Sequence, residues 1–161
     1  MKYKLIFALL AVFLILPGQS VSGKGKKPLQ YDIEKAGIGV EGTILVKVWV
    51  YTKNGKGVSD QDLKRVAVHG IVFRGCSGGQ SGARQPAMAP ATAEADNAAF
   101  CEAFFADDGP CQNYATIVAG SYDRVKTQKG YKSGAVLQID KTSLRKELEK
   151  AGVVRVLSSG F

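Results

Sequence analysis

Residues 42–51, GTILVKVWVY, constrain the fold more than any other stretch of the sequence. Apolar side chains occupy every second position from Ile44 to Val50. Successive side chains of a β-strand point to opposite faces of a sheet, so this alternation predicts a strand with one face in the core and the other partly exposed. The two sets are Ile44, Val46, Val48 and Val50 toward the core, and Thr43, Leu45, Lys47, Trp49 and Tyr51 away from it.

A helix is predicted directly after this strand. Residues 54–57, NGKG, form a turn that ends the strand, and Ser59 with Asp62 three positions later makes a capping box at a helix start. We expect the helix to reach about Val68 and the apolar residues 71–73, IVF, to form a short buried strand. Together these elements predict a β-α-β unit.

The second half of the chain predicts two further helices and a β-hairpin. One helix begins at a Thr92 cap and runs to about Ala106, and the hairpin pairs residues 114–126 with residues 131–139. The last helix begins at Asp140. The apolar positions are Phe100, Cys101, Phe104 and Phe105 on the first helix, and Leu144, Leu148 and Ala151 on the last.

Residues 75–91, GCSGGQSGARQPAMAPA, show no periodicity and are rich in Gly, Ser, Ala and Pro. A loop of this length inside a compact domain is either functional or mobile.

These elements predict one small α+β domain over residues 41–161. Its sheet is expected to be mixed, with the β-α-β unit, the hairpin and about three helices packed on it. Residues 23–40 carry several lysines and are expected to form a basic, flexible N-terminal segment.

Residues 1–22 have the pattern of a secretory signal peptide. Lys2 and Lys4 precede an uninterrupted apolar run from Leu5 to Leu16, and small residues at 20–22 suit cleavage after Ser22. The run is shorter than the ~20 residues that span a bilayer, although an uncleaved membrane anchor is the alternative. We therefore expect an exported protein of the periplasm or outer membrane, or one that is secreted.

The net charge bears on the partners. The whole chain carries +8, and removal of the two lysines in the signal peptide leaves +6. A basic exported protein can contact anionic lipid or an acidic glycan, whereas nucleic acid is not an expected partner outside the cytoplasm.

The three cysteines are an odd number, so at least one is free or pairs between chains. Cys101 lies near the end of its predicted helix and Cys111 follows the Asp-Asp-Gly-Pro turn, which favours a disulfide between these two. Pairing of Cys76 with either remains the alternative. With no CxxC pair and one histidine, the sequence predicts no metal site and no cofactor.

The string Gly75–Gly79, GCSGG, resembles the segment around the nucleophile of trypsin-like proteases and a glycine-rich segment of papain-like proteases. A serine or cysteine nucleophile needs a base that a third group orients. The one histidine, His69, lies at a predicted helix end just upstream, and nothing in the sequence orients it. We therefore expect no enzymatic activity, with a hydrolase that uses this loop as the alternative.

Four residues are candidates for a ligand or partner surface: Trp49, Tyr51, Arg74 and Arg84. The two aromatic residues alternate on the less buried face of their strand and form a possible platform for a sugar or peptide. The competing interpretation is that a loop or helix packs over them.

Two stretches resemble known families. Gly130 to Gly152, GYKSGAVLQIDKTSLRKELEKAG, is similar to the end of the LPP-type envelope lipoproteins and to the N-terminal domain of the flagellar assembly protein T. Leu45 to Gly75, with LVKVWVYTKNGKG and DLKRVAVHGIVFRG, resembles uncharacterised secreted proteins of Bacteroides-type bacteria. The resemblance implies an α+β envelope module associated with secretion or surface-structure assembly and implies no catalytic residue.

Two functions are therefore expected. The first is a structural or assembly-accessory protein of the envelope, which acts by protein–protein contacts with other envelope proteins. The alternative is a periplasmic binding module for glycan, peptidoglycan or peptide.

Overall fold

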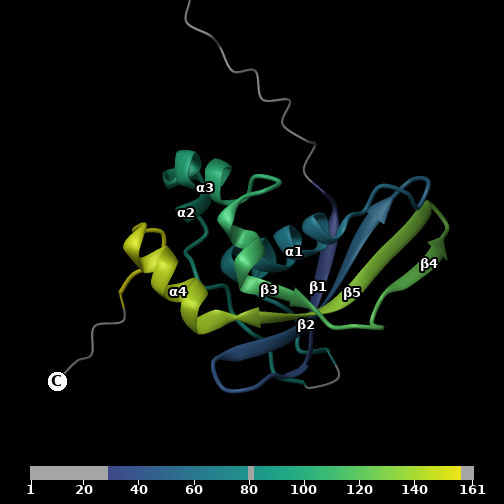
Figure 1. The fold of residues 1–161 in the computed structure, drawn as a ribbon, viewed down its shortest axis with the longest axis horizontal. Coiled ribbons are helices and arrows are strands. Elements are labelled where there is room, and N and C mark those ends of the chain that lie inside the picture. Colours follow the sequence, from purple (N-terminus) through teal and green to yellow (C-terminus); the bar gives the residue numbers. More distant parts are fainter. Residues whose placement is uncertain (1–28, 80–81, 157–161) are drawn as a thin grey trace, which may run out of the picture.

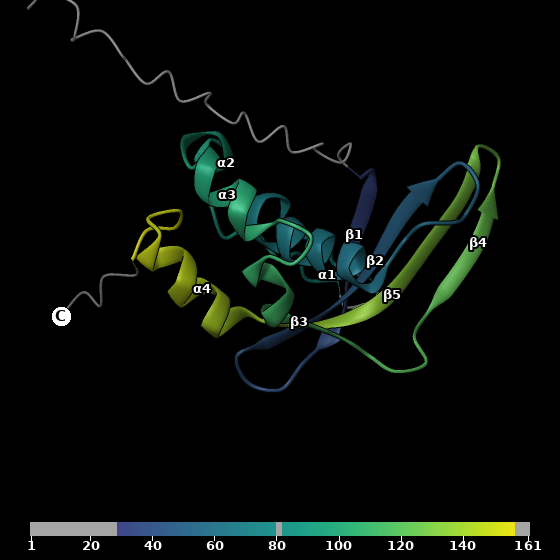
Figure 2. The same ribbon diagram turned by 45° about the horizontal axis from the view of Figure 1, so that its top comes forward.

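The computed structural model describes residues 29–79 and 82–156 (Figure 1). The predicted signal peptide and residues 23–28 lie outside the described residues. Within them the chain is an α+β domain, as expected, with five strands in one open sheet and helices on one face (Figures 1 and 2). No helix in these ranges is both long and apolar enough to cross a membrane.

The sheet is antiparallel throughout. Its strands follow the order β1-β2-β5-β3, and β4 pairs with the other half of β5. The strands are β1 (Tyr31–Ile38), β2 (Thr43–Thr52), β3 (Ala115–Ile117), β4 (Asp123–Thr127) and β5 (Gly130–Asp140). The alternation predicted for 42–51 is confirmed by β2, in which Val46, Val48 and Val50 have no exposed surface.

The expected flexible segment at 23–40 is wrong for Tyr31–Ile38, because these residues form the edge strand β1 on β2. Tyr31 is buried and Ile33 packs partly against the core, while Asp32 and Glu34 face outward. The charged residues hide the alternation in the sequence, and pairing with β2 stabilises the strand.

Helix α1 (Asp60–His69) begins with the predicted capping box. The Ser59 hydroxyl accepts a hydrogen bond from the Asp62 amide at 3.1 Å, and the Asp62 carboxylate accepts one from the Ser59 amide at 3.1 Å. Helical structure then continues as a π-helical turn, Gly70–Arg74. The predicted strand at 71–73 is therefore wrong, and with it the β-α-β unit and the mixed sheet. A short apolar run has no period that separates a buried strand from a buried helix.

The loop after the π-helical turn donates hydrogen bonds to carbonyl groups of that turn. The Met88 and Ala89 amides donate to the carbonyls of Ile71 and Val72 at 3.2 and 2.9 Å. Gly75 ends the turn with φ +71°, and a Cβ there would collide with the backbone of Gln85 and Pro86. Much of residues 75–91 is therefore docked against the helix.

The helix predicted over 92–106 is broken into α2 (Ala93–Asp96) and α3 (Ala98–Phe104). Thr92 makes no side-chain capping bond, and the Asn97 side chain at the break donates to the Ala93 carbonyl at 2.9 Å. The strand predicted over 114–126 is likewise split into β3 and β4, with residues 118–122 as a turn that includes Gly120 at φ +74°.

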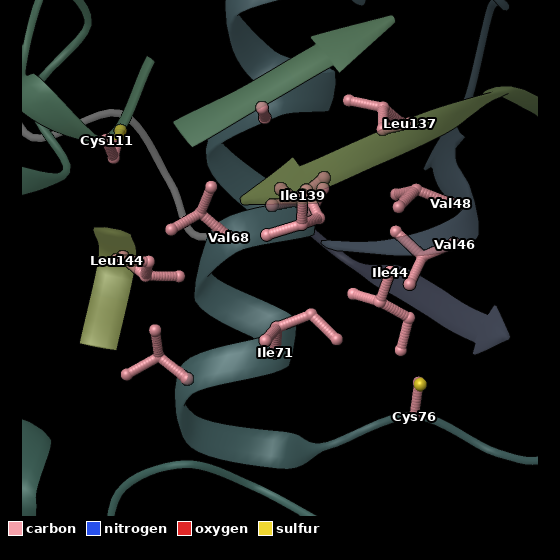
Figure 3. Packing of buried hydrophobic residues seen from close by; sticks show 14 of the residues in the cluster. Ile44, Val46, Val48, Val68, Ile71, Cys76, Cys111, Leu137, Ile139 and Leu144 are labelled. Atoms are coloured by element: carbon pink, nitrogen blue, oxygen red, sulfur yellow. The ribbon is translucent and has the colours of Figure 1, made fainter. Parts of the chain in front are cut away.

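The core lies between the sheet and the helices (Figure 3). Side chains of β2 and β5 meet those of α1 and the π-helical turn, and α4 (Lys141–Lys150) closes the far end. Leu144 and Leu148 of α4 are fully buried, as predicted from their spacing. Figure 3 labels Ile44, Val46, Val48, Val68, Ile71, Leu137, Ile139 and Leu144 in this cluster.

Candidate functional site

The face of the sheet opposite the core is covered by no helix among the described residues (Figure 2). Strand register brings its central residues together: Trp49 lies opposite Gly134 of β5, Tyr51 opposite Lys132, and Lys47 opposite Val136. We call Leu45, Lys47, Trp49, Tyr51, Lys132 and Val136 the open face; all six are half-buried.

Trp49 is the centre of the open face. Its indole packs closely against Gly134. A Cβ atom on that glycine would lie only 2.8 Å from the ring atom Cε3. The ammonium groups of Lys47 and Lys132 lie 4.8 and 4.4 Å from the ring centroid. Two such cation–π contacts hold both lysines over the indole, each stabilising the arrangement by about 0.5–1 kcal/mol at an exposed site.

Carboxylates border the same face. Lys47 forms an ion pair with Asp123 of β4, and its ammonium also donates to the Ser121 carbonyl at 3.2 Å. The Tyr51 hydroxyl donates to Asp32 of β1 at 2.5 Å. This hydrogen bond raises the pKa of Tyr51, so its phenol stays protonated. The polar groups at the border are thus largely paired with one another, and the apolar and aromatic surface lies between them.

The four predicted surface residues do not form one site. Trp49 and Tyr51 share the open face, where neighbouring side chains of the sheet half-bury them. The guanidinium of Arg74 lies 4.3 Å from the ring centroid of the buried Tyr31, on the core side of β1. Arg84 is exposed on the loop that follows the π-helical turn.

The sequence interpretation missed a second polar arrangement, on the helical side. The Tyr31 hydroxyl lies 2.6 Å from Nδ1 of His69, and Nε2 of His69 lies 3.0 Å from Oε1 of Glu94. With its proton on Nε2, His69 accepts from Tyr31 and donates to Glu94. Nothing in the sequence indicates it, because the three residues come from β1, α1 and α2.

This arrangement is not an activated nucleophile. Burial raises the pKa of Tyr31 to about 12, and Tyr31 is only 6% exposed. The His69 ring packs against Phe73 and Phe105, with ring centroids 5.2 and 5.4 Å apart. The hydrogen bonds therefore join β1, α1 and α2 rather than present a reactive atom to solvent.

The expected disulfide between Cys101 and Cys111 is wrong, because all three cysteines are free, buried thiols. Cys111 belongs to the main core cluster, whereas Cys101 lies outside it on the buried side of α3. The 3₁₀ turn Pro110–Tyr114 places Cys111 in the core, where its side chain has no exposed surface. Cys76 also lies at the core, at the far side of the cluster from Cys111 (Figure 3).

The two candidate nucleophiles of the GCSGG string differ in exposure, since Cys76 is buried and Ser77 is exposed. Burial raises the pKa of the Cys76 thiol, and the Cys76 backbone forms two hydrogen bonds with Gln85 at 2.8 and 3.1 Å. Ser77 is exposed, and its carbonyl accepts from the Lys35 amide of β1 at 2.9 Å. No group of three potential metal ligands occurs within residues 29–79 and 82–156.

Comparisons of this chain with models of protein families, with curated proteins and with solved structures found no match.

Proposed function

We propose that this chain is an exported, non-enzymatic accessory protein of the cell envelope that binds another envelope protein through its open face. The observation that supports this most strongly is Trp49, which lies half-buried at the centre of a sheet face without a covering helix. Tryptophan and tyrosine are over-represented among the residues that dominate binding energy at protein interfaces.

The composition of the open face also supports a protein partner. Leu45 and Val136 extend the apolar surface on either side of Lys47, and the ion pair with Asp123 lies at the margin. The open face thus combines aromatic and apolar surface with two lysines over the indole and an ion pair at its rim. Enriched aromatic residues and a polar rim are typical of protein interfaces. The buried, protonated state of Tyr31 and the raised pKa of Cys76 support a role without covalent catalysis.

Site-specific photo-cross-linking tests the proposal. A benzophenone amino acid replaces Trp49 in one variant and Tyr122 in the other, in cells that produce the protein. Tyr122 is a suitable control because it is exposed and its hydroxyl donates to Asp60 on the helical side. We expect a discrete adduct with an envelope protein from position 49 and none from position 122. Identical adducts at both positions, or no adduct at 49, would contradict the proposal.

Export is tested separately. The Lys-apolar-small pattern of residues 1–22 is the support for it, and the mature chain is expected to begin within two residues of Gly23. N-terminal sequencing of protein from fractionated cells measures this. Recovery of Met1, or fractionation with the cytoplasm, would refute export but leave the binding proposal to its own test.

The second candidate is binding of an acidic glycan, which the two ammonium groups beside Trp49 favour. Trp49 is the one tryptophan of the chain, so its fluorescence reports directly on the open face. Saturable quenching by a polyuronate, but not by a neutral glycan of equal length, would support this function. Absence of quenching with both would leave the protein partner as the better proposal.

A further inference from the structure

A cavity of about 480 Å³ lies at the end of the sheet, and none of the six residues of the open face is part of its lining. Its walls come from the β1–β2 turn at Gly42 and Thr43, the loop segment 85–88, and α4. Figure 1 shows α4 starting close to this turn, and the Lys141 amide donates to the Gly42 carbonyl at 3.0 Å. Small-molecule sites in proteins have volumes of about 300–1,000 Å³, so the cavity is large enough for a sugar-sized ligand.

The helical wall is strongly basic. Lys141, Arg145 and Lys146 line the cavity, and Glu149 is the one carboxylate in the lining among the described residues. Glu149 lies 3.5 Å from Arg145, so it offsets one of three positive charges and the lining retains a net charge of +2. Lys141 and Arg145 are four residues apart and therefore lie on the same face of α4.

Side chains, not the backbone, must recognise an anion here. The Lys141 and Thr142 amides both donate to the Gly42 carbonyl, and the Ser143 amide donates to Asp140 at 2.9 Å. The first amides of α4 are thus already engaged. Arg145 offers a planar fork of donors that matches a phosphate or carboxylate, and each lysine adds a mobile positive charge.

The opposite wall is apolar and held in place. Pro86, Ala87 and Met88 supply it, and the Met88 amide is bound to the Ile71 carbonyl. The Gln85 side-chain carbonyl accepts from the Lys141 ammonium at 3.0 Å, which joins the two walls. The cavity therefore combines a basic side with a preformed apolar side, as sites for small organic anions do.

We propose that this cavity binds a monosaccharide-sized organic anion that carries a phosphate or a carboxylate. Arg145 and Lys141 contact the oxyanion, Lys146 adds charge at the mouth, and the ring of the ligand packs on Pro86 and Met88. The two surfaces share no residue, so binding in this cavity can be tested separately from binding at the open face.

Isothermal titration calorimetry of the mature protein tests the proposal with three matched probes: glucose, glucuronate and glucose 6-phosphate. We expect saturable binding of at least one anion, no binding of glucose, and weaker binding at high salt. The stronger of the two anions identifies the head group. Equal binding of all three, or binding of none, would overturn the proposal.

Charge-neutral variants locate the site. Arg145→Gln and Lys141→Gln are each expected to weaken anion binding about tenfold or more, since each removes a charge-assisted hydrogen bond. Lys150→Gln is the matched control, because this lysine is 76% exposed, lies outside the cavity and is on the same helix. Its affinity is expected to stay within about twofold of the unaltered protein. An equal loss in all three variants, with thermal unfolding unchanged, would show general charge attraction and refute a specific site.

Discussion

Substitution Ser59→Ala tests how the start of α1 is stabilised. The Ser59 hydroxyl accepts from the Asp62 amide at 3.1 Å and donates to the Asp62 carboxylate at 2.9 Å. Alanine removes both bonds and leaves the backbone bond from the Ser59 amide to Asp62. The perturbation is thus confined to one oxygen atom at a helix terminus.

The expected magnitude follows from the burial of Asp62. Loss of a serine cap costs about 1 kcal/mol, and a hydrogen bond to a charged group contributes about 1.5–3 kcal/mol. Asp62 is 6% exposed, so water cannot fully replace the lost donor, but its ion pair with Arg65 remains. We therefore expect Ser59→Ala to lower the free energy of unfolding by about 2 kcal/mol.

Urea unfolding followed by circular dichroism measures this change, with two controls. Thr92→Ala alters the other helix start predicted from the sequence, but Thr92 makes no capping bond and is expected to change stability by less than about 0.5 kcal/mol. Ser59→Thr keeps the oxygen and is expected to retain most of the stability. The reasoning fails if both alanine variants lose the same stability, or if threonine is as harmful as alanine at position 59.

Three further outcomes are expected. Burial raises the pKa of Tyr31 from 10 to about 12. The pKa of Tyr31 is higher in the folded state than in the unfolded state. The neutral Tyr31 phenol therefore contributes to the stability of the fold below pH 10, and this contribution is lost as the pH rises to about 12. Ultraviolet titration should show one phenol fewer ionising near pH 12 in Tyr31→Phe than in the unaltered protein, and equal numbers in the two proteins would contradict this. All three cysteine thiols are buried, and the pKa of Cys111 is raised to about 11. A thiol reagent at pH 8 should therefore label no cysteine in the native protein and three in urea. Labelling of one cysteine in urea would reveal a disulfide. Leu148→Ala should lower the free energy of unfolding by about 2–5 kcal/mol, measured by urea unfolding. The exposed control Val156→Ala should lower it by less than about 0.5 kcal/mol. Similar losses in the two variants would be inconsistent with the packing of α4.

Sequence patterns with a strict local period predicted the fold well. The alternation in β2, the Ser59–Asp62 capping box and the spacing of Leu144 and Leu148 are all confirmed. Each depends on residues within one element, so the sequence contains the whole signal. The α+β class followed from these elements alone.

The errors share a physical cause, which is that tertiary partners decided the local structure. Tyr31–Ile38 becomes a strand because β2 offers it an edge, although three of its eight residues are charged. Residues 71–73 remain helical, and the loop at 88–89 supplies donors to the carbonyls of Ile71 and Val72. Neither partner can be inferred from the short segment itself.

The candidate site, like the fold, could be predicted only where it depends on the pattern within one element. Trp49 and Tyr51 followed from the alternation of β2, but Lys132 and Asp123 join them through the register of β5 and β4. The spacing of Lys141 and Arg145, two basic residues of the cavity, places them on one helix face from the sequence alone. The apolar wall of the cavity could not be placed in this way, because residues 85–88 have no periodic pattern to locate them.

The geometry around Trp49 also favours one of the two proposed partners of the open face. A sugar that stacks on the indole must compete with the ammonium groups at 4.4 and 4.8 Å from the ring centroid. Moving Lys47 away also breaks its ion pair with Asp123. A protein surface can instead cover the indole edge together with Leu45 and Val136 while both lysines remain in place. Burial of these apolar groups then contributes about 25 cal/mol per Å² without loss of the cation–π contacts, which favours the protein partner.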